Sequence, residues 1–369
     1  MLPLTNLYIE IKGFTASRKA FFYFLKSTTI KKINTMKKQI NKWVVTLAFA
    51  NIYLIWGVTF LAISIGLQGF PPFILSGLRF LIAGLLIISY LRAKGEKANS
   101  FDNWRKNAIT GILILTGGTG LVAWGEQFVT AAEAAIAMAT GPFWFIAIDK
   151  KNWRYYFSDK CIPIGLLIGF TGLVLFLKGS ANASFHSDVS PTLRFAAFVV
   201  LALSSVSWVL GSLFSKNYPS GHSTFMNIAQ QLIAAGLTSL LLASINSEWK
   251  QFTIETIPLN AWLSLLFLIL FGSVVAYLSY IWLLSVRPAA LVSTHTYINP
   301  IVAVVAGWFA AHEAVNANQL IGLVVILLGV LLTNLTKYFK LSKRSKVKIR
   351  RTLRVWGRVS QPYKYITDF

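Results

Sequence analysis

Ionisable side chains in long apolar stretches are the residues of this sequence best able to do chemistry. Arg79, Glu126 and His295 all occur within or at the end of such stretches. If the stretches cross a bilayer, each buried ionisable group costs at least about 2.5–3.5 kcal/mol and requires a partner or a function. Arg79 could pair with a carboxylate such as Glu126 or Glu133, or with carbonyls at a helix C-terminus, in a structural role. It could also anchor an anionic or carboxylate-bearing substrate, and the two roles are compatible.

Glu126 and His295 each allow two interpretations. A carboxylate near the end of a membrane span is commonly an interfacial charge, whereas a partly buried one can carry a coupling proton. A lone membrane histidine is often an interhelical hydrogen-bond partner. His295, however, lies in a polar band with Tyr297 and Asn299, just before Pro300. A helix kinked by proline can expose carbonyls to a cavity, so His295 is also a candidate for lining a substrate path or relaying protons.

Aromatic residues supply further candidates. Tryptophan near a span end usually belongs to the interfacial belt, which does not account for Trp56 and Trp208 in the middle of apolar stretches. These two could be packing residues or a pair that flanks a cavity. The candidate substrate-binding residues are Trp56, Arg79, Trp124, Gln127, Trp208, Tyr280, His295, Tyr297 and Asn299, and the candidate proton carriers are Glu126 and His295.

The stretches that carry these residues have the length and composition of transmembrane helices. Of the 369 residues, 55% are hydrophobic, and the mean hydropathy is +0.61. Apolar runs of about 20 residues cross a hydrocarbon core of about 30 Å, and in lipid such runs must be helical to satisfy their own backbone. We therefore predict an all-α, polytopic transmembrane bundle of ten helices at residues 43–66, 71–91, 107–127, 130–148, 161–178, 194–215, 222–245, 261–284, 288–310 and 318–338.

Basic residues predict the orientation of this bundle. The formal net charge of +23 would suggest nucleic-acid binding in a soluble protein. Most Lys and Arg lie in the two tails and two short loops, so we expect no nucleic-acid partner and attribute the charge to topology and to the lipid bilayer. The pattern favours the cell inner (plasma) membrane with both termini cytoplasmic. Residues 1–42 form a basic N-terminal segment, with Met36 a candidate native start, and residues 339–369 form a basic tail.

The sequence contains an internal repeat. The second copy matches the first in register, aligning Trp124, Ala131-Ala132 and Gly141-Pro142 with Trp282, Ala289-Ala290 and Asn299-Pro300. Each copy holds five spans, an odd number, so the second must enter the membrane from the opposite side. We predict two inverted five-helix repeats at residues 43–180 and 193–338. Such copies can exchange conformations around a central site, which favours alternating access.

These residues together resemble the drug/metabolite transporter superfamily, in its ten-helix EamA-type branch of metabolite exporters. The resemblance covers about residues 41–338 and rests on Trp56-Gly57, Leu78-Arg79-Phe80, Ala131-Ala132 to Pro142, Tyr277 to Trp282, Ala289 to Pro300, Gly307, Glu313, Gly322 and Gly329. It implies a ten-helix fold with a central substrate cavity and export of amino acids, other metabolites or drugs. Arg79 aligns with Gln230 of the second copy, so the two copies are not chemically equivalent.

The residues favour a secondary transporter over two other classes. The sequence has no nucleotide-binding signature, and its single Cys161 excludes a multi-cysteine metal site, so we expect no cofactor, no metal and no enzyme activity. A proton is the candidate coupling ion and a small molecule the expected substrate. The alternatives are a membrane-embedded enzyme or lipid-handling protein that uses Arg79, Glu126 and His295, and a channel.

Overall fold

The structure of the chain is a computed structural model. It describes residues 42–96, 100–158, 160–180, 189–220, 223–250, 252–287, 289–311, 317–318, 320–329 and 331–332. These residues fall into two units, Met1–Leu47 and Ala48–Phe369. The first contributes only the start of the first helix, and the arrangements below concern the second. Nearly all of segment 1–42 and the whole tail 339–369 lie outside the described residues, as does Met36.

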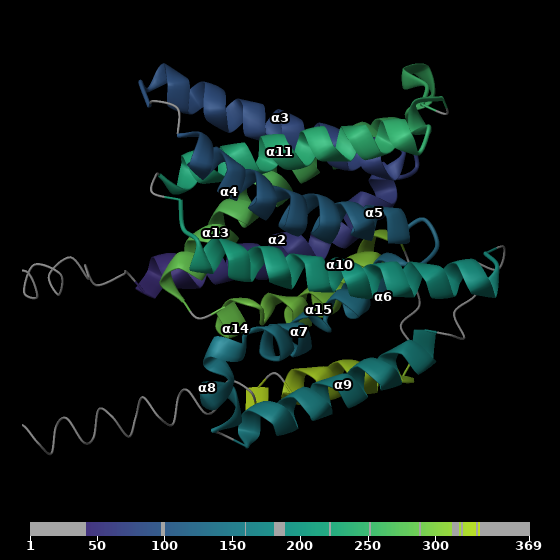
Figure 1. The fold of residues 1–369 in the computed structure, drawn as a ribbon. Helices are drawn as coiled ribbons and strands as arrows, with labels where there is room; N and C mark the ends of the chain where they lie inside the picture. The colour runs from purple at the N-terminus through teal and green to yellow at the C-terminus, as the bar shows by residue number, and fades with distance from the viewer. Residues whose placement is uncertain are drawn as a thin grey trace, which may run out of the picture. The chain divides into compact units, whose positions relative to one another are not determined.

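The described residues are helical and contain no strand (Figure 1). The longer elements are α2 (Lys42–Gly66), α3 (Pro72–Ala93), α4 (Phe101–Gly111), η1 (Ile112–Gly120), α5 (Leu121–Gly125), α6 (Ala131–Met138), α7 (Gly141–Ile148), α9 (Cys161–Ser180), α10 (Pro191–Asn217), α11 (Thr224–Ile245), α12 (Leu259–Phe267), η5 (Leu268–Ala276), α13 (Tyr277–Val286), α14 (Ala289–Val292) and α15 (His295–Ala311). Short connecting elements are η2 (Lys150–Asn152), α8 (Trp153–Phe157), η3 (Glu248–Lys250) and η4 (Ile254–Thr256).

Seven of the described helical segments are long and apolar enough to cross a membrane. They are Lys42–Gly66, Pro72–Ala93, Phe101–Gly125, Ala131–Ile148, Pro191–Asn217, Thr224–Ile245 and Leu259–Val286. The fifth and tenth predicted spans correspond to shorter apolar helices at Cys161–Phe176 and Leu320–Gly329, and the ninth is divided between α14 and α15. The helical membrane class is therefore confirmed, while the count of ten stays a prediction.

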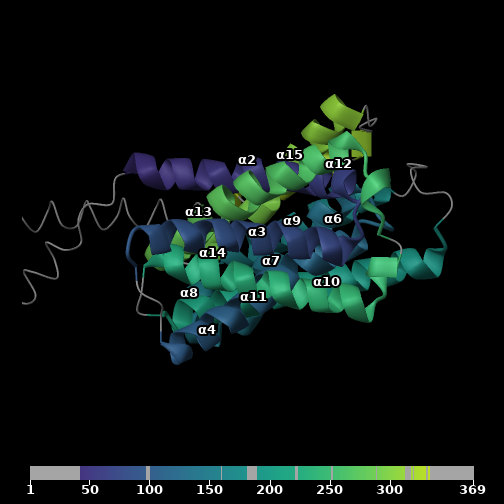
Figure 2. The same cartoon turned by 90° about the horizontal axis from the view of Figure 1, so that it is seen from above.

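Corresponding helices of the two repeats pack against each other in opposite directions. Helices α3 and α11 run side by side in both views (Figures 1 and 2). Gly77 faces Leu240, while Gly84, two turns later, faces Ile233, so one helix ascends as the other descends. An added Cβ at either glycine would come within 3.0 Å of its neighbour. Antiparallel contact of equivalent helices is what a two-fold axis in the membrane plane produces, which agrees with inverted repeats.

The fifth spans of the two repeats also pack against each other in opposite directions. Gly172 of α9 lies against the backbone of Gly322 and Ile326, while Gly329 lies against the backbone of Gly169. A Cβ at Gly329 would lie 2.5 Å from the Gly169 nitrogen. Small residues thus let these two helices approach closely, as their seven-residue spacing in the sequence indicates.

Among the described residues, each repeat contains a π-helical segment. These segments are η1 in the third span and η5 in the eighth, each nine residues long. π-Helical turns are rare and frequently occur at functional sites. The two segments thus occupy corresponding spans of the two repeats.

The carboxylate of Glu248, in the loop after α11, caps the N-terminus of α3. Pro72 provides no backbone N–H, and the Glu248 carboxylate accepts hydrogen bonds from the backbone N–H groups of Phe73 and Ile74, both at 3.0 Å. These are two of the unpaired donors that every helix start presents. Burial raises the pKa of Glu248, and the two backbone hydrogen bonds oppose this rise in pKa without cancelling it.

Candidate functional site

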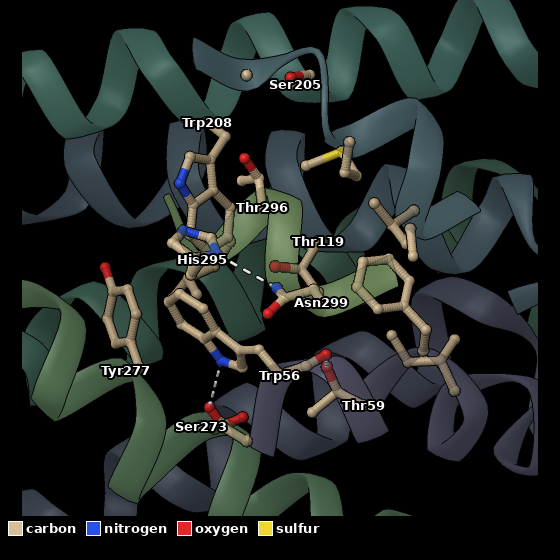
Figure 3. Close-up of a pocket in the computed structure, with 18 of the residues that line it drawn as sticks. Trp56, Thr59, Thr119, Ser205, Trp208, Ser273, Tyr277, His295, Thr296 and Asn299 are labelled. Atoms are coloured by element: carbon tan, nitrogen blue, oxygen red, sulfur yellow. Dashed lines mark hydrogen bonds between the residues drawn. The ribbon is translucent and has the colours of Figure 1, made fainter. Parts of the chain in front are cut away.

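A cavity lies in the middle of the bundle, among residues from both repeats. It contains roughly 750 Å³ of space, including the part open to the outside. Figure 3 shows its polar side chains converging from several helices. The lining residues of the first repeat are Trp56, Thr59, Phe60, Ile63, Arg79, Phe80, Leu115, Thr119, Val122, Ala135, Met138, Gly141 and Phe145. Those of the second are Ser205, Trp208, Gly272, Ser273, Tyr277, His295, Thr296 and Asn299.

Four aromatic rings meet at one wall of this cavity, three of them lining it and the fourth, that of Tyr280, lying behind it. The Trp56 ring centroid lies 5.1 Å from that of Trp208, 5.0 Å from that of Tyr280 and 4.9 Å from that of His295. The Trp56–Trp208 and Trp56–His295 pairs meet edge to face, a favourable geometry for aromatic side chains. The two repeat-related tryptophans are therefore in direct contact across the interface of the repeats.

Hydrogen bonds behind the wall hold these rings in place. The Trp208 Nε1–H donates to the Tyr280 hydroxyl at 2.8 Å, and that hydroxyl also lies 2.6 Å from Ser212 Oγ. The Trp56 Nε1–H donates to the Gly272 carbonyl at 3.2 Å. Tyr280 is fully buried and does not line the cavity itself. Its place is behind the wall, where it positions Trp208.

His295 presents one ring nitrogen without a partner. Its Nδ1 lies 3.2 Å from the Asn299 side-chain amide (Figure 3). When that amide is oriented to satisfy its neighbours, its oxygen accepts from Nδ1, and its nitrogen donates to the carbonyls of His295, Ile52 and Tyr53. This orientation places the proton of a neutral imidazole on Nδ1. Nε2 then remains an acceptor with no hydrogen-bond partner in the described residues.

Arg79 is the cationic group of the cavity. Its side chain is 3% exposed, its Nε–H donates to Ser273 Oγ at 3.3 Å, and its guanidinium carbon lies 4.7 Å from the Phe80 ring centroid. Nη1 has no hydrogen-bond partner in the described residues. A guanidinium so buried and only partly satisfied is unusual, because an unpaired charged donor loses its hydration without compensation.

Glu126 is a second buried ionisable group without a hydrogen-bond partner in the described residues. It follows α5 and is buried, and neither carboxylate oxygen has a hydrogen-bond partner in the part of the chain that the structure describes. The charges of Glu126 and Arg79 act on each other, although the described residues contain no direct ion pair between the two. Glu126 lies one turn beyond Val122, which lines the cavity. It is therefore close to the cavity but not part of its wall.

Several residues that the sequence singled out lie elsewhere. Trp124 packs edge to face on Phe128, at 5.1 Å between ring centroids, and the exposed Gln127 donates to the Trp124 carbonyl. Tyr297 is buried in a separate apolar cluster with Ala139 and Ile326. None of Trp124, Gln127 and Tyr297 lines the cavity.

Glu133 has a structural role. It forms a capping box with Thr130 at the start of α6, and its carboxylate makes an ion pair with Arg194 of α10. Of the two carboxylates considered as partners of Arg79, Glu133 is thus engaged with another arginine.

The π-helical segments supply lining residues that the sequence reasoning missed. Leu115 and Thr119 come from η1, Gly272 and Ser273 from η5, and Tyr277 directly follows η5. Periodicity arguments assume 3.6 residues per turn, so they assign such residues to the wrong face. The polar residues in otherwise apolar runs, Thr119 and Ser273, are the one signal that could have indicated them.

Comparison with known proteins settles the family. The model of the EamA-like transporter family matches the chain twice, at residues 42–178 and 195–335. The chain belongs to the EamA-like transporter family. Its two matches correspond to two copies of one unit, which confirms the resemblance and the internal repeat inferred from the sequence.

Similar proteins are named as transporters. The inner membrane transporter YedA of Escherichia coli K12 is 31% identical over 290 residues, which cover 78% of this chain and 89% of YedA. The transporter YoaV of Bacillus subtilis is 25% identical, over 79% of this chain and 97% of its own. A crystal structure at 20% identity has the same fold, with a TM-score of 0.60 over 79% of this chain. These relatives support a multi-pass membrane protein that functions in transport and is not an enzyme.

Proposed function

We propose that this protein is a secondary transporter that exports a small metabolite through the central cavity by alternating access. The observation that carries the proposal is that both inverted repeats line one cavity, whose wall includes the repeat-related pair Trp56 and Trp208. If one repeat changes its tilt relative to the other, a cavity at their interface opens to the opposite side of the membrane. The same lining residues then contact the substrate in both the inward-open and the outward-open state.

The substrate-binding residues proposed are those that both the sequence singled out and the cavity contains: Trp56, Arg79, Trp208, His295 and Asn299. Tyr280 is proposed to act through Trp208, because its hydroxyl accepts the indole N–H. The proposed location is the inner (plasma) membrane with both termini cytoplasmic, as the basic loops favour.

Flux measurements with a matched pair of variants test the proposal. Proteoliposomes loaded with a defined mixture of amino acids and other small metabolites are followed by mass spectrometry of the released solutes. We expect saturable release of a subset of them, and Trp208→Ala should reduce it at least about tenfold, since a large anchor of the wall is lost. Trp308→Ala is the control, because Trp308 is 54% exposed on the outside of α15.

The outcomes separate the alternatives. Release that rises linearly with concentration would indicate a channel and contradict alternating access. Chemical conversion of a loaded compound without release would favour the membrane enzyme that uses Arg79, Glu126 and His295. Equal release by both tryptophan variants, each monodisperse in detergent, would exclude the cavity as the path.

A further inference from the structure

Arg79 lines the cavity and has one donor nitrogen without a hydrogen-bond partner in the described residues. Arg79 is almost fully buried and lines the cavity together with Thr59, Gly272 and Ser273. Its Nε–H is engaged with Ser273 Oγ, which fixes the plane of the guanidinium, while Nη1 has no partner in the described residues. A buried guanidinium that lines a cavity and keeps one donor nitrogen unpaired can receive an acceptor from a bound solute.

The geometry of a guanidinium selects the kind of acceptor. Its planar donors match the two oxygens of a carboxylate better than a single carbonyl oxygen, and the charge strengthens each hydrogen bond. Ser273 Oγ already accepts from Nε, so its own hydroxyl proton is available to the same carboxylate. The cationic end of the cavity therefore fits a carboxylate.

The rest of the cavity fits an apolar or aromatic group. Around the wall of Trp56 and Trp208 lie Phe60, Phe145 and Met138, and His295 contributes an edge-to-face contact with Trp56. Aromatic side chains bind flat, polarizable groups well, and methionine adapts to irregular shapes. The cavity thus combines a cation with adjoining aromatic surface, because Trp56 donates a hydrogen bond to the carbonyl of Gly272, next to the serine that Arg79 contacts.

From this arrangement we propose that the cavity binds an amphipathic organic carboxylate, with its carboxylate on Arg79 and its apolar part against Trp56 and Trp208, and that a proton binds Glu126 together with it. The proposal rests on the proposed function, since it concerns the substrate of the same cavity. It adds the chemical class of the substrate and the reason why a proton accompanies it.

Charge balance supplies that reason. When Arg79 and Glu126 are both ionised, their buried charges offset each other, whereas a bound carboxylate would then leave one excess negative charge in a medium of low dielectric constant. Of the elements packed against α5, η1 has no titratable residue, Arg194 of α10 is paired with Glu133, and Arg79 of α3 is the charge that acts on Glu126. Protonation of Glu126 removes the excess charge, so carboxylate and proton are bound together and move in the same direction.

Binding measurements on the purified full-length protein in detergent test the substrate class. The probes are phenylacetate, its neutral amide phenylacetamide and the cation phenethylamine. We expect phenylacetate to bind at least about tenfold more tightly than either analogue, because only it satisfies the arginine. Arg79→Gln should abolish this preference and Arg79→Lys should keep part of it. Arg92→Gln is the control, since Arg92 is exposed at the other end of α3. Equal affinity of wild-type protein for phenylacetate and phenylacetamide would overturn the proposal.

Calorimetry in buffers of different ionisation enthalpy tests the proton. We expect uptake of about one proton per phenylacetate bound near neutral pH. In Glu126→Gln the uptake should vanish while binding persists, and Glu255→Gln, an exposed carboxylate, should behave as the wild type. Unchanged proton uptake in Glu126→Gln would refute the role of Glu126.

The failure of this inference can be told apart from failure of the proposed function. Saturable flux of neutral or cationic solutes without any preference for carboxylates would support the transporter function and contradict the carboxylate as substrate class. Charge-selective binding of phenylacetate without flux of any solute would support the carboxylate site and contradict the proposed transport function.

Discussion

The contact between α3 and α11 gives a sharp prediction about a single methyl group. A Cβ added at Gly236 would lie 2.6 Å from the Leu81 nitrogen, 2.7 Å from its Cβ and 2.8 Å from its Cα, whereas ordinary contacts begin at 3.4 Å. Gly236→Ala therefore forces the two backbones apart by about 0.8 Å, because backbone atoms cannot rotate away as a side chain can. Overpacking of this kind costs about 1–3 kcal/mol, with about tenfold in the folded-to-unfolded ratio for each 1.4 kcal/mol.

Unfolding in mixed micelles of increasing SDS content measures this cost. The matched control is Gly169→Ala, where the nearest atom, Tyr297 Cε1, would lie 3.9 Å away. Both variants gain the same helix propensity, so their difference in free energy of unfolding reports the contact alone. Gly236→Ala should also weaken substrate binding, since Arg79 lies two residues from Leu81. Equal free energies of unfolding for the two variants would refute the tight approach of α3 and α11.

Three further predictions concern hydrogen bonds. Tyr280→Phe leaves the buried Trp208 N–H without an acceptor and should lower the free energy of unfolding by about 1–3 kcal/mol, measured in the same micelles, with a matching loss of solute flux. Thr130→Val removes the capping box that Thr130 shares with Glu133 and should cost about 0.5–2 kcal/mol; an unchanged unfolding midpoint would contradict it. Glu248 has a raised pKa in the folded protein, so the folded state binds its proton more readily, and the stability due to this group falls as pH rises above 4.5. Glu248→Gln should flatten that part of the thermal-unfolding profile between pH 4.5 and 7, and identical profiles would rule the effect out.

The fold could be predicted from the sequence because two independent patterns agree. Apolar length predicts membrane helices, and the register of Trp124 with Trp282 predicts a repeat, whose odd number of spans implies inversion. The antiparallel contacts of α3 with α11 follow from that inversion. Helix bounds were harder to predict, because a long helix such as α10 continues past the apolar stretch that identifies it.

The residues that line the candidate cavity could be predicted from the sequence only in part, for a physical reason. Trp56, Trp208, Arg79 and His295 stand out as polar or bulky residues in the middle of spans, and they do meet in one cavity. Tyr297 is two residues from His295, and Trp124 and Gln127 follow the lining residue Val122, yet none of the three lines the cavity. Which face a residue occupies depends on the phase of the helix, and the π-helical segments shift that phase without leaving a clear trace in the sequence.

The paired π-helical segments have a mechanical consequence. A π-helical turn holds one residue more than an α-helical turn, so rewinding a segment such as η5 into α-helix would rotate everything beyond it by about 100° about the helix axis. Tyr277 and Tyr280 follow η5 directly, so such a rotation would withdraw one from the cavity wall and release the support of Trp208. Rewinding of either segment would thus couple a rotation of the helix beyond it to a change in the cavity wall. Because the repeats are inverted, the described segments η1 and η5 would do so in opposite senses across the membrane.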